Sequence, residues 1–294
     1  MVAKDSYSSL NGHAMMSGSG RESYTKNSSY QRGVIDAAKL HIQSAIAKKL
    51  QPENFATLDA FSIADLGCSV GPNTFFSVQN ILEAVKLNIS DHIGNIVLQA
   101  FRDRSIPACS YEHLSTLCTL RIHSTGFLKC RKRLQIESHL LGTRGGFTTF
   151  LHAREEITKA YLSQHAMDMA NFLSARAEEV VPGGIMTIVV PARPNGTPHD
   201  QVIFNMMFDL LGSCLMELSK NGLIDEEKVD SFNIPAYCTR PQELEAAIQK
   251  NECFTIESIE FALSDGTGHS PWAPRCIFQH KSHYSGINKG TFWW

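Results

Sequence analysis

Residues 61–73 read FSIADLGCSVGPN, and this run carries most of the information that the sequence holds about the fold. The first four residues are apolar or small and have the composition of a buried strand, and Asp65–Gly71 follows as a turn with two glycines. Apolar residues then recur at helical spacing over Thr74–Lys86, and Ile96–Leu98 has the composition of a second buried strand. A strand, a glycine loop, a helix and another strand in this order predict the opening of a doubly wound α/β sheet.

The rest of the chain continues the alternation of helices and strands. The further elements that we expect are helices at 35–50, 155–181 and 199–220, a buried strand at 185–190, a helix start at Thr239-Arg240-Pro241 and a late strand at 254–261. These elements divide the chain into a flexible N-terminal arm (1–33), an α/β core (34–193), a helical cap (194–250), and a late strand with an aberrant tail (251–294).

The bulk composition excludes several kinds of partner. With 294 residues, 43% of them hydrophobic, the chain can bury the core of one large domain. A net charge of −2 gives no general attraction to nucleic acid or to an anionic membrane. No apolar run reaches membrane-spanning length, and the first residues lack the order of a signal peptide. The eight cysteines are scattered without a C-x-x-C pair, so we expect reduced thiols and a cytoplasmic location.

The glycine turn after the first strand favours a small-molecule ligand. Glycine lets the backbone turn sharply and approach a ligand, and the helix that follows offers free N–H groups. The dinucleotide pattern G-x-G-x-x-G is not met because Ser69 occupies the middle glycine position. The pattern D-x-G-x-x-x-G fits S-adenosylmethionine (SAM) better. Two alternatives stay open: a turn that serves only packing, and a nicotinamide oxidoreductase, which the missing glycine disfavours.

Four strings together resemble one family of plant enzymes. They are residues 23–31 (SYTKNSSYQ), 65–73 (DLGCSVGPN), 175–184 (ARAEEVVPGG) and 230–235 (DSFNIP). In order and spacing they resemble the SABATH (salicylic acid, benzoic acid, theobromine) methyltransferases of plant secondary metabolism. This resemblance covers roughly residues 20–98 and 153–272. It implies a SAM-dependent methyltransferase that acts on the carboxyl group of a small-molecule acid. The implied fold is a Rossmann-like class I methyltransferase sheet with a helical cap, incomplete in this chain.

The resemblance also implies roles for individual residues. Those that would contact SAM are Tyr24, Ser28, Asp65, Gly67, Cys68 and Asn73. Gln31 would hold the carboxylate of the acceptor. The matching magnesium loop consists of Asp230, Phe232 (through its carbonyl) and Asn233, and hard oxygen ligands on a tight loop suit Mg²⁺.

Each of these roles has a purely structural alternative. Tyr24 and Ser28 could anchor and cap the first helix, Gln31 could be an exposed helix residue, and Asp230 could be the N-cap of a turn. The resemblance implies a small-molecule acid as partner, with no nucleic acid and no membrane, and it leaves room for a homodimer.

The expected reaction places most of its demand on positioning. The methyl group on a sulfonium is already activated and a carboxylate is ionised at neutral pH, so no general base is required. Catalysis would come from holding oxygen, methyl carbon and sulfur in line.

Residues 101–152 depart from the family. They hold eight Lys and Arg against three Asp and Glu, and they follow neither helical nor strand period for long. Asp103 lies near the position of the Asp that binds the ribose in the family, but its neighbours do not match. The segment whose Trp clamps the acceptor is absent. Reverse translation of residues 117–153 in a frame shifted by two bases permits a near-complete family segment. We therefore hypothesise a frame-shifted and truncated reading, and we expect the chain as written to be a poor catalyst or a non-catalytic remnant.

Overall fold

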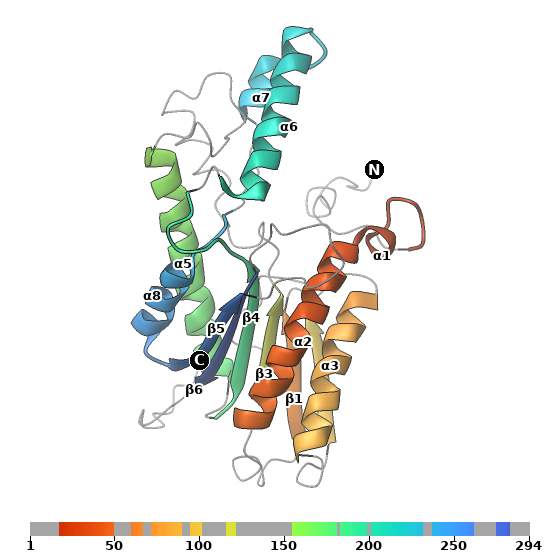
Figure 1. Cartoon of the computed structure of the whole chain (residues 1–294), viewed down its shortest axis with the longest axis vertical. Helices are drawn as coiled ribbons and strands as arrows, with labels where there is room; N and C mark the ends of the chain where they lie inside the picture. Colours follow the sequence, from red (N-terminus) through yellow and green to blue (C-terminus); the bar gives the residue numbers. More distant parts are fainter. Residues whose placement is uncertain are drawn as a thin grey trace, which may run out of the picture.

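The structure is a computed structural model of the whole chain, drawn in Figure 1. It describes residues 18–49, 60–66, 72–89, 95–101, 116–121, 155–180, 183–198, 201–231, 237–261 and 275–282.

Six strands form one mixed sheet in the order β2-β1-β3-β4-β6-β5. The four parallel strands are β1 (Ala60–Leu66), β2 (Asn95–Phe101), β3 (Thr116–Arg121) and β4 (Ile185–Pro191). The two antiparallel strands are β5 (Phe254–Phe261) and β6 (Arg275–Ser282), and β6 lies between β4 and β5. The parallel arrangement places the carboxyl ends of β1, β3 and β4 at one end of the sheet.

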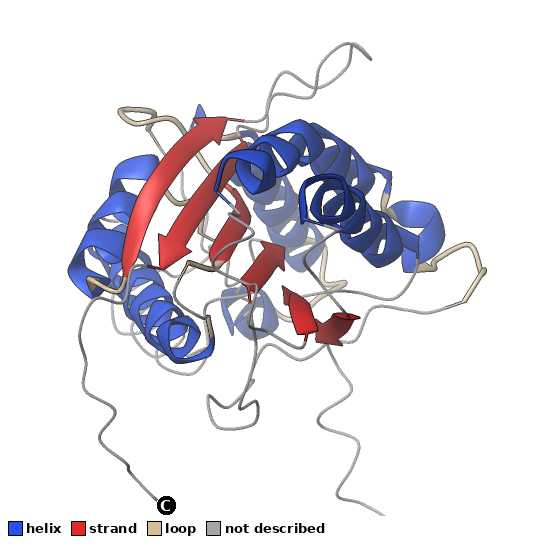
Figure 2. Ribbon diagram, turned by 90° about the horizontal axis from the view of Figure 1, so that it is seen from below, coloured by secondary structure: helices blue, strands red, loops and turns tan. Residues whose placement is uncertain are grey.

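Helices cover both faces of this sheet (Figures 1 and 2). The described helices are α1 (Tyr24–Asn27), α2 (Ser29–Lys49), α3 (Pro72–Ile89), α5 (Glu155–Glu179), α6 (Ile203–Lys220), α7 (Glu226–Ser231) and α8 (Pro241–Asn251). On one face α2 packs against α3, and on the other α5 packs against α8. In Figure 1, α6 and α7 stand beyond the end of the sheet at which β4 ends.

The core is divided by β4, whose successive side chains point to opposite faces. Met186, Ile188 and Val190 belong to the cluster with α5 and α8, whereas Ile185 and Val189 belong to the cluster with α2 and α3. All five side chains are buried. A strand that is buried on both faces has a nearly continuous apolar sequence, which is why residues 185–190 could be predicted as a strand.

The expected α/β architecture with a parallel sheet is confirmed, and two strands are additions to it. Both β3 and β6 lie in segments that the sequence marked as aberrant. Each is paired along both of its edges, β3 with β1 and β4, and β6 with β4 and β5. Backbone pairing of this kind depends on the neighbouring strands, so it leaves little trace in the periodicity of the segment itself.

Two domain boundaries also differ from those expected. Residues 24–27 and 29–33 are helical, and Tyr24 and Ser28 are buried, so this part of the expected arm is attached to the core. Helix α8, assigned to the cap, packs against α5 and β5 on the sheet. The cap beyond the sheet therefore consists of α6 and α7, and we use the word cap for residues 201–231. Within the described part of the chain, no helix is long and apolar enough to cross a membrane.

Candidate cofactor site and the base of the cap

The site expected to bind SAM lies where β1 ends and α3 begins. Asp65 is the penultimate residue of β1, and its side chain is fully buried. In register it lies between Ala100 of β2 and Thr119 of β3, so it is flanked by strands on both sides. Gly67 and Cys68 lie outside the described residues, and their roles stay predictions.

A buried contact joins the N-terminal helices to this end of the sheet. The Asn73 side-chain amide, on the first turn of α3, donates hydrogen bonds to the Ser28 carbonyl oxygen (3.1 Å) and to Ser28 Oγ (2.9 Å). The two residues are 45 positions apart in the chain, and both are buried. The structure thus brings together two of the residues that the resemblance assigned to SAM.

Tyr24 lies on the same N-terminal segment with its side chain in the interior. Its hydroxyl oxygen is buried and has no hydrogen-bond partner within the described part of the chain, and the same holds for Ser23 Oγ. A buried hydroxyl without a partner costs free energy, so a polar ligand that accepts from it or donates to it would be stabilised there. These hydroxyls are suited to contact a polar small molecule.

Gln31 lies in the first turn of α2 and is partly buried. The alternative of an exposed helix residue is therefore wrong. Its neighbour Arg32 fixes the start of α2 by donating to the Asp36 carboxylate (3.0 Å) and by placing its guanidinium carbon 3.4 Å from the centre of the Phe76 ring on α3. Cation–π contacts of this type stabilise the packing of the two helices.

The magnesium site stays a prediction. Asp230 is the penultimate residue of α7, and Phe232 and Asn233 lie outside the described residues. Among the residues that the structure does describe, no group of three or more His, Cys, Asp or Glu side chains could hold a metal ion.

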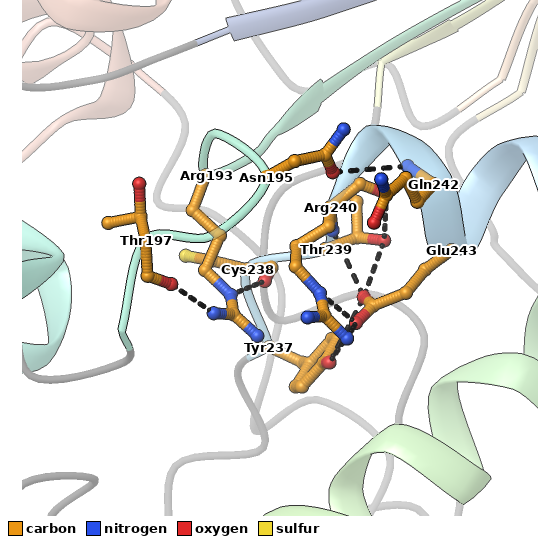
Figure 3. Close-up of polar contacts among 9 residues, drawn as sticks. All are labelled: Arg193, Asn195, Thr197, Tyr237, Cys238, Thr239, Arg240, Gln242 and Glu243. Atoms are coloured by element: carbon orange, nitrogen blue, oxygen red, sulfur yellow. Dashed lines mark hydrogen bonds and ion pairs between the residues drawn. The ribbon is translucent and has the colours of Figure 1, made fainter.

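A second polar cluster, which we did not expect from the sequence, lies at the base of the cap (Figure 3). Its centre is the Glu243 carboxylate on the first turn of α8, which accepts hydrogen bonds from the Tyr237 hydroxyl (3.0 Å), the Arg240 backbone N–H (3.0 Å) and the Arg240 guanidinium (2.6 Å). Thr239 Oγ1 adds a longer contact at 3.3 Å. The sequence contains one indication of this cluster. Glu243 stands three residues after the N-cap Arg240, which is the position of the glutamate in a capping box.

Burial changes the titration of three groups in and beside this cluster. The rings of His165 on α5 and Tyr237 lie 5.1 Å apart. Burial lowers the pKa of His165 to about 4, although the Glu243 charge opposes this change. The pKa of Tyr237 is raised, first by burial and then by Glu243. Burial also raises the pKa of the Cys238 thiol to about 11, so His165, Tyr237 and Cys238 are uncharged at neutral pH.

Comparison with known proteins decides the family. A sequence model of the SAM-dependent carboxyl methyltransferases matches residues 11–102 and 125–284. The chain belongs to this family. The match confirms the expected enzyme class, a SAM-dependent carboxyl O-methyltransferase. Within residues 101–152, where we expected a departure from the family, residues 103–124 stay unmatched. Residues 125–152 are matched, so that part of the expectation is wrong.

Curated plant methyltransferases are similar over most of their length. Loganic acid O-methyltransferase of Catharanthus roseus is 36% identical, over 84% of this chain and 75% of the relative. Farnesoic acid carboxyl-O-methyltransferase of Arabidopsis thaliana is 32% identical, over 90% of this chain and 82% of the relative. Salicylate carboxymethyltransferase of Clarkia breweri is 31% identical, over 84% of this chain and 75% of the relative.

A solved structure confirms the methyltransferase fold. The structure of a loganic acid methyltransferase with SAH superposes with a TM-score of 0.73 at 29% identity, covering 92% of this chain and 99% of that chain. The expectation of a Rossmann-like methyltransferase sheet with a helical cap is therefore confirmed.

Proposed function

We propose that this methyltransferase binds SAM between the carboxyl end of β1, the start of α3 and the segment Tyr24–Ser28. The observation that carries this proposal is the buried pair of hydrogen bonds from Asn73 to Ser28, which holds that segment against α3. The residues present fit such a ligand. The buried Tyr24 hydroxyl has no partner within the described residues. Asp65 is fully buried near the carboxyl end of β1, beside the start of α3.

The chain's own residues would mainly orient the reactants. When bound, SAM supplies a methyl group on a positively charged sulfur. Tyr24 and Ser28 would hold the donor and keep water out, since both side chains are buried. Gln31 would donate its side-chain amide to one oxygen of the acceptor carboxylate and leave the other free to react. Orientation of this kind can contribute roughly 7–11 kcal/mol to lowering the barrier.

The acceptor that we propose is a small-molecule carboxylic acid of terpenoid or aromatic type. The similar proteins are named for loganic acid, farnesoic acid and salicylate, each of which carries a carboxyl group. We further propose a cytoplasmic location, a homodimer, and a magnesium ion held by Asp230, Phe232 and Asn233. Loss of thermal stabilisation by Mg²⁺ in Asp230→Asn would test the metal.

Methyl transfer tests the main proposal directly. The purified chain is incubated with methyl-labelled SAM and with loganic acid, farnesoic acid or salicylate, and labelled ester is extracted. Loss of a hydrogen bond to a charged group predicts that Gln31→Ala lowers kcat/KM by about 10- to 100-fold. Gln43→Ala is the matched control, because Gln43 lies on the same helix and is also partly buried. Equal activity of the two variants would remove Gln31 from the site.

A second candidate function is binding of SAM or its demethylated product SAH without methyl transfer. The unmatched residues 103–124 and the absent acceptor-clamping Trp favour it. Calorimetry with SAH, run beside the transfer assay, separates the two functions. Binding without transfer, together with transfer by a frame-corrected chain, would establish the second. Turnover by the chain as written would exclude it.

A further inference from the structure

The cap is joined to the sheet by two segments that lie side by side. Residues 192–197 lead from β4 towards α6, and residues 237–240 lead into α8. Ala192 and Thr239 form a parallel β-bridge, and the Arg193 backbone N–H donates to the Thr239 carbonyl oxygen at 2.9 Å. Figure 3 shows the two segments beside one another. Any movement of the cap as a body must therefore act on this pair of segments.

Arg193 ties the two segments together from the sheet side. Its side chain is buried, and its Nε donates to the Cys238 carbonyl oxygen at 3.2 Å. One terminal nitrogen of the same guanidinium donates to the Thr197 carbonyl oxygen. A single planar group thus holds both connections, an arrangement that the fork of donors on Arg makes possible.

Glu243 holds the second segment from the α8 side. Helix α8 is fixed on the sheet by Leu244 and Ile248, which are fully or almost fully buried in the cluster with β4 and α5. From this rigid base the Glu243 carboxylate binds Tyr237, Thr239 and Arg240, that is, three of the four residues in the segment. The residues just before Tyr237 include Asp230, Phe232 and Asn233, which the sequence assigns to the metal loop.

We propose that Glu243 is a positioning residue that fixes the exit of the cap and thereby orients the acceptor side of the site. The inference rests on the proposed function, which places the donor and Gln31 at the carboxyl end of the parallel strands, and α6 and α7 stand beyond this same end (Figure 1). Glu243 itself lies on α8 and would touch neither reactant. Its removal should therefore weaken acceptor binding and leave donor binding unchanged.

The charge of Glu243 and its hydrogen bonds make separable contributions. In Glu243→Gln the side-chain oxygen can still accept from the Tyr237 hydroxyl, but the ion pair with Arg240 is lost. In Glu243→Ala all the contacts are lost, and the buried hydroxyl of Tyr237 loses the acceptor that Figure 3 shows. Glu245→Gln makes the same change of charge on the same helix and serves as the control.

Two measurements on the full chain test this role. Salicylate, loganic acid and farnesoic acid are titrated calorimetrically into the SAH-saturated protein, and hydrogen exchange is followed in peptides from 203–231 and from 60–66. We expect Glu243→Ala to weaken acceptor binding by about tenfold, the factor for one hydrogen bond to a charged group, with SAH affinity within about twofold of wild type. Peptides of 203–231 should exchange faster, whereas those of 60–66 should not. Glu243→Gln should weaken acceptor binding and speed exchange of the 203–231 peptides to a smaller extent. It provides the test if Glu243→Ala does not fold.

Three outcomes would overturn the inference. The first is equal weakening of SAH and acceptor, which indicates a general loss of structure. The second is an acceptor affinity as in wild type, and the third is unchanged exchange of the cap peptides. If the wild-type protein binds none of the three acids, the acceptor assignment in the proposed function fails, and the exchange measurement alone decides the role of Glu243.

Discussion

Replacing Asn73 by alanine tests the buried contact that joins α3 to the N-terminal segment. The substitution removes an amide that donates two hydrogen bonds, to the carbonyl oxygen and to the hydroxyl of Ser28. A buried hydrogen bond contributes about 0.5–1.5 kcal/mol net, so the loss of two should cost roughly 2 kcal/mol. This cost falls on the docking of residues 24–28 and not on the sheet.

The consequence for the cofactor can be bounded from the same number. If only the docked segment binds SAH, the apparent Kd rises in proportion to the loss of the docked fraction. A change of roughly 2 kcal/mol corresponds to a factor of about 30, which is the upper limit for the rise in Kd. The assay is calorimetry of SAH binding, combined with chemical denaturation to measure the free energy of unfolding.

A control and a double-mutant cycle complete this experiment. Asn88→Ala is the matched control, because Asn88 lies on the same helix and donates to the carbonyl oxygen of Ala84 within α3. Ser28→Ala should be less harmful than Asn73→Ala, since it removes one of the two acceptors and keeps the backbone carbonyl. The effects should not add in the double variant. An SAH affinity and an unfolding free energy that stay at wild-type values in Asn73→Ala would refute the reasoning.

Three further predictions concern buried side chains. Burial lowers the pKa of His165 from 6.5 to about 4, so the unfolded chain binds a proton more readily than the folded protein between these pH values. The free energy of unfolding should therefore fall as the pH drops from 6.5 to 4. Urea denaturation should show that this fall is about 3 kcal/mol larger in wild type than in His165→Gln. Leu173→Ala should cost about 2–5 kcal/mol, since Leu173 is fully buried in the cluster with β4; a smaller loss would mean that the core relaxes. At pH 8, iodoacetamide should modify exposed Cys214 and spare Cys238, whose thiol pKa is raised to about 11, as mass spectrometry of the peptides would show.

The parts of the fold that were predictable are those with a strong local pattern. The run from β1 into α3 and the apolar strand β4 could be placed because burial on a sheet constrains every residue of these strands. The strands β3 and β6 could not, because their partners are set by the surrounding sheet and not by their own composition. Helix α8 was recognisable by Pro241 at its first turn, but its contact with α5 depends on tertiary packing.

The candidate site was predictable in the same uneven way. The turn after β1 follows from its glycines, whereas Ser28 and Asn73 were linked only by resemblance to a family, since a contact over 45 positions has no local signature. Glu243 was visible as a helix-capping residue, but its bonds to Tyr237 and Thr239 depend on how the chain returns from the cap.

The position of β6 between β4 and β5 has a consequence for synthesis of the protein. On the ribosome, β4 and β5 are made before residues 275–282, yet neither can pair with the other without the strand that separates them. The nascent chain must therefore hold the edge of β4, one of its most apolar strands, unpaired while some 80 residues are added, on the order of 4–16 seconds at common elongation rates. Unpaired apolar edges promote association between chains, so this interval is the one in which a molecular chaperone would be of most use.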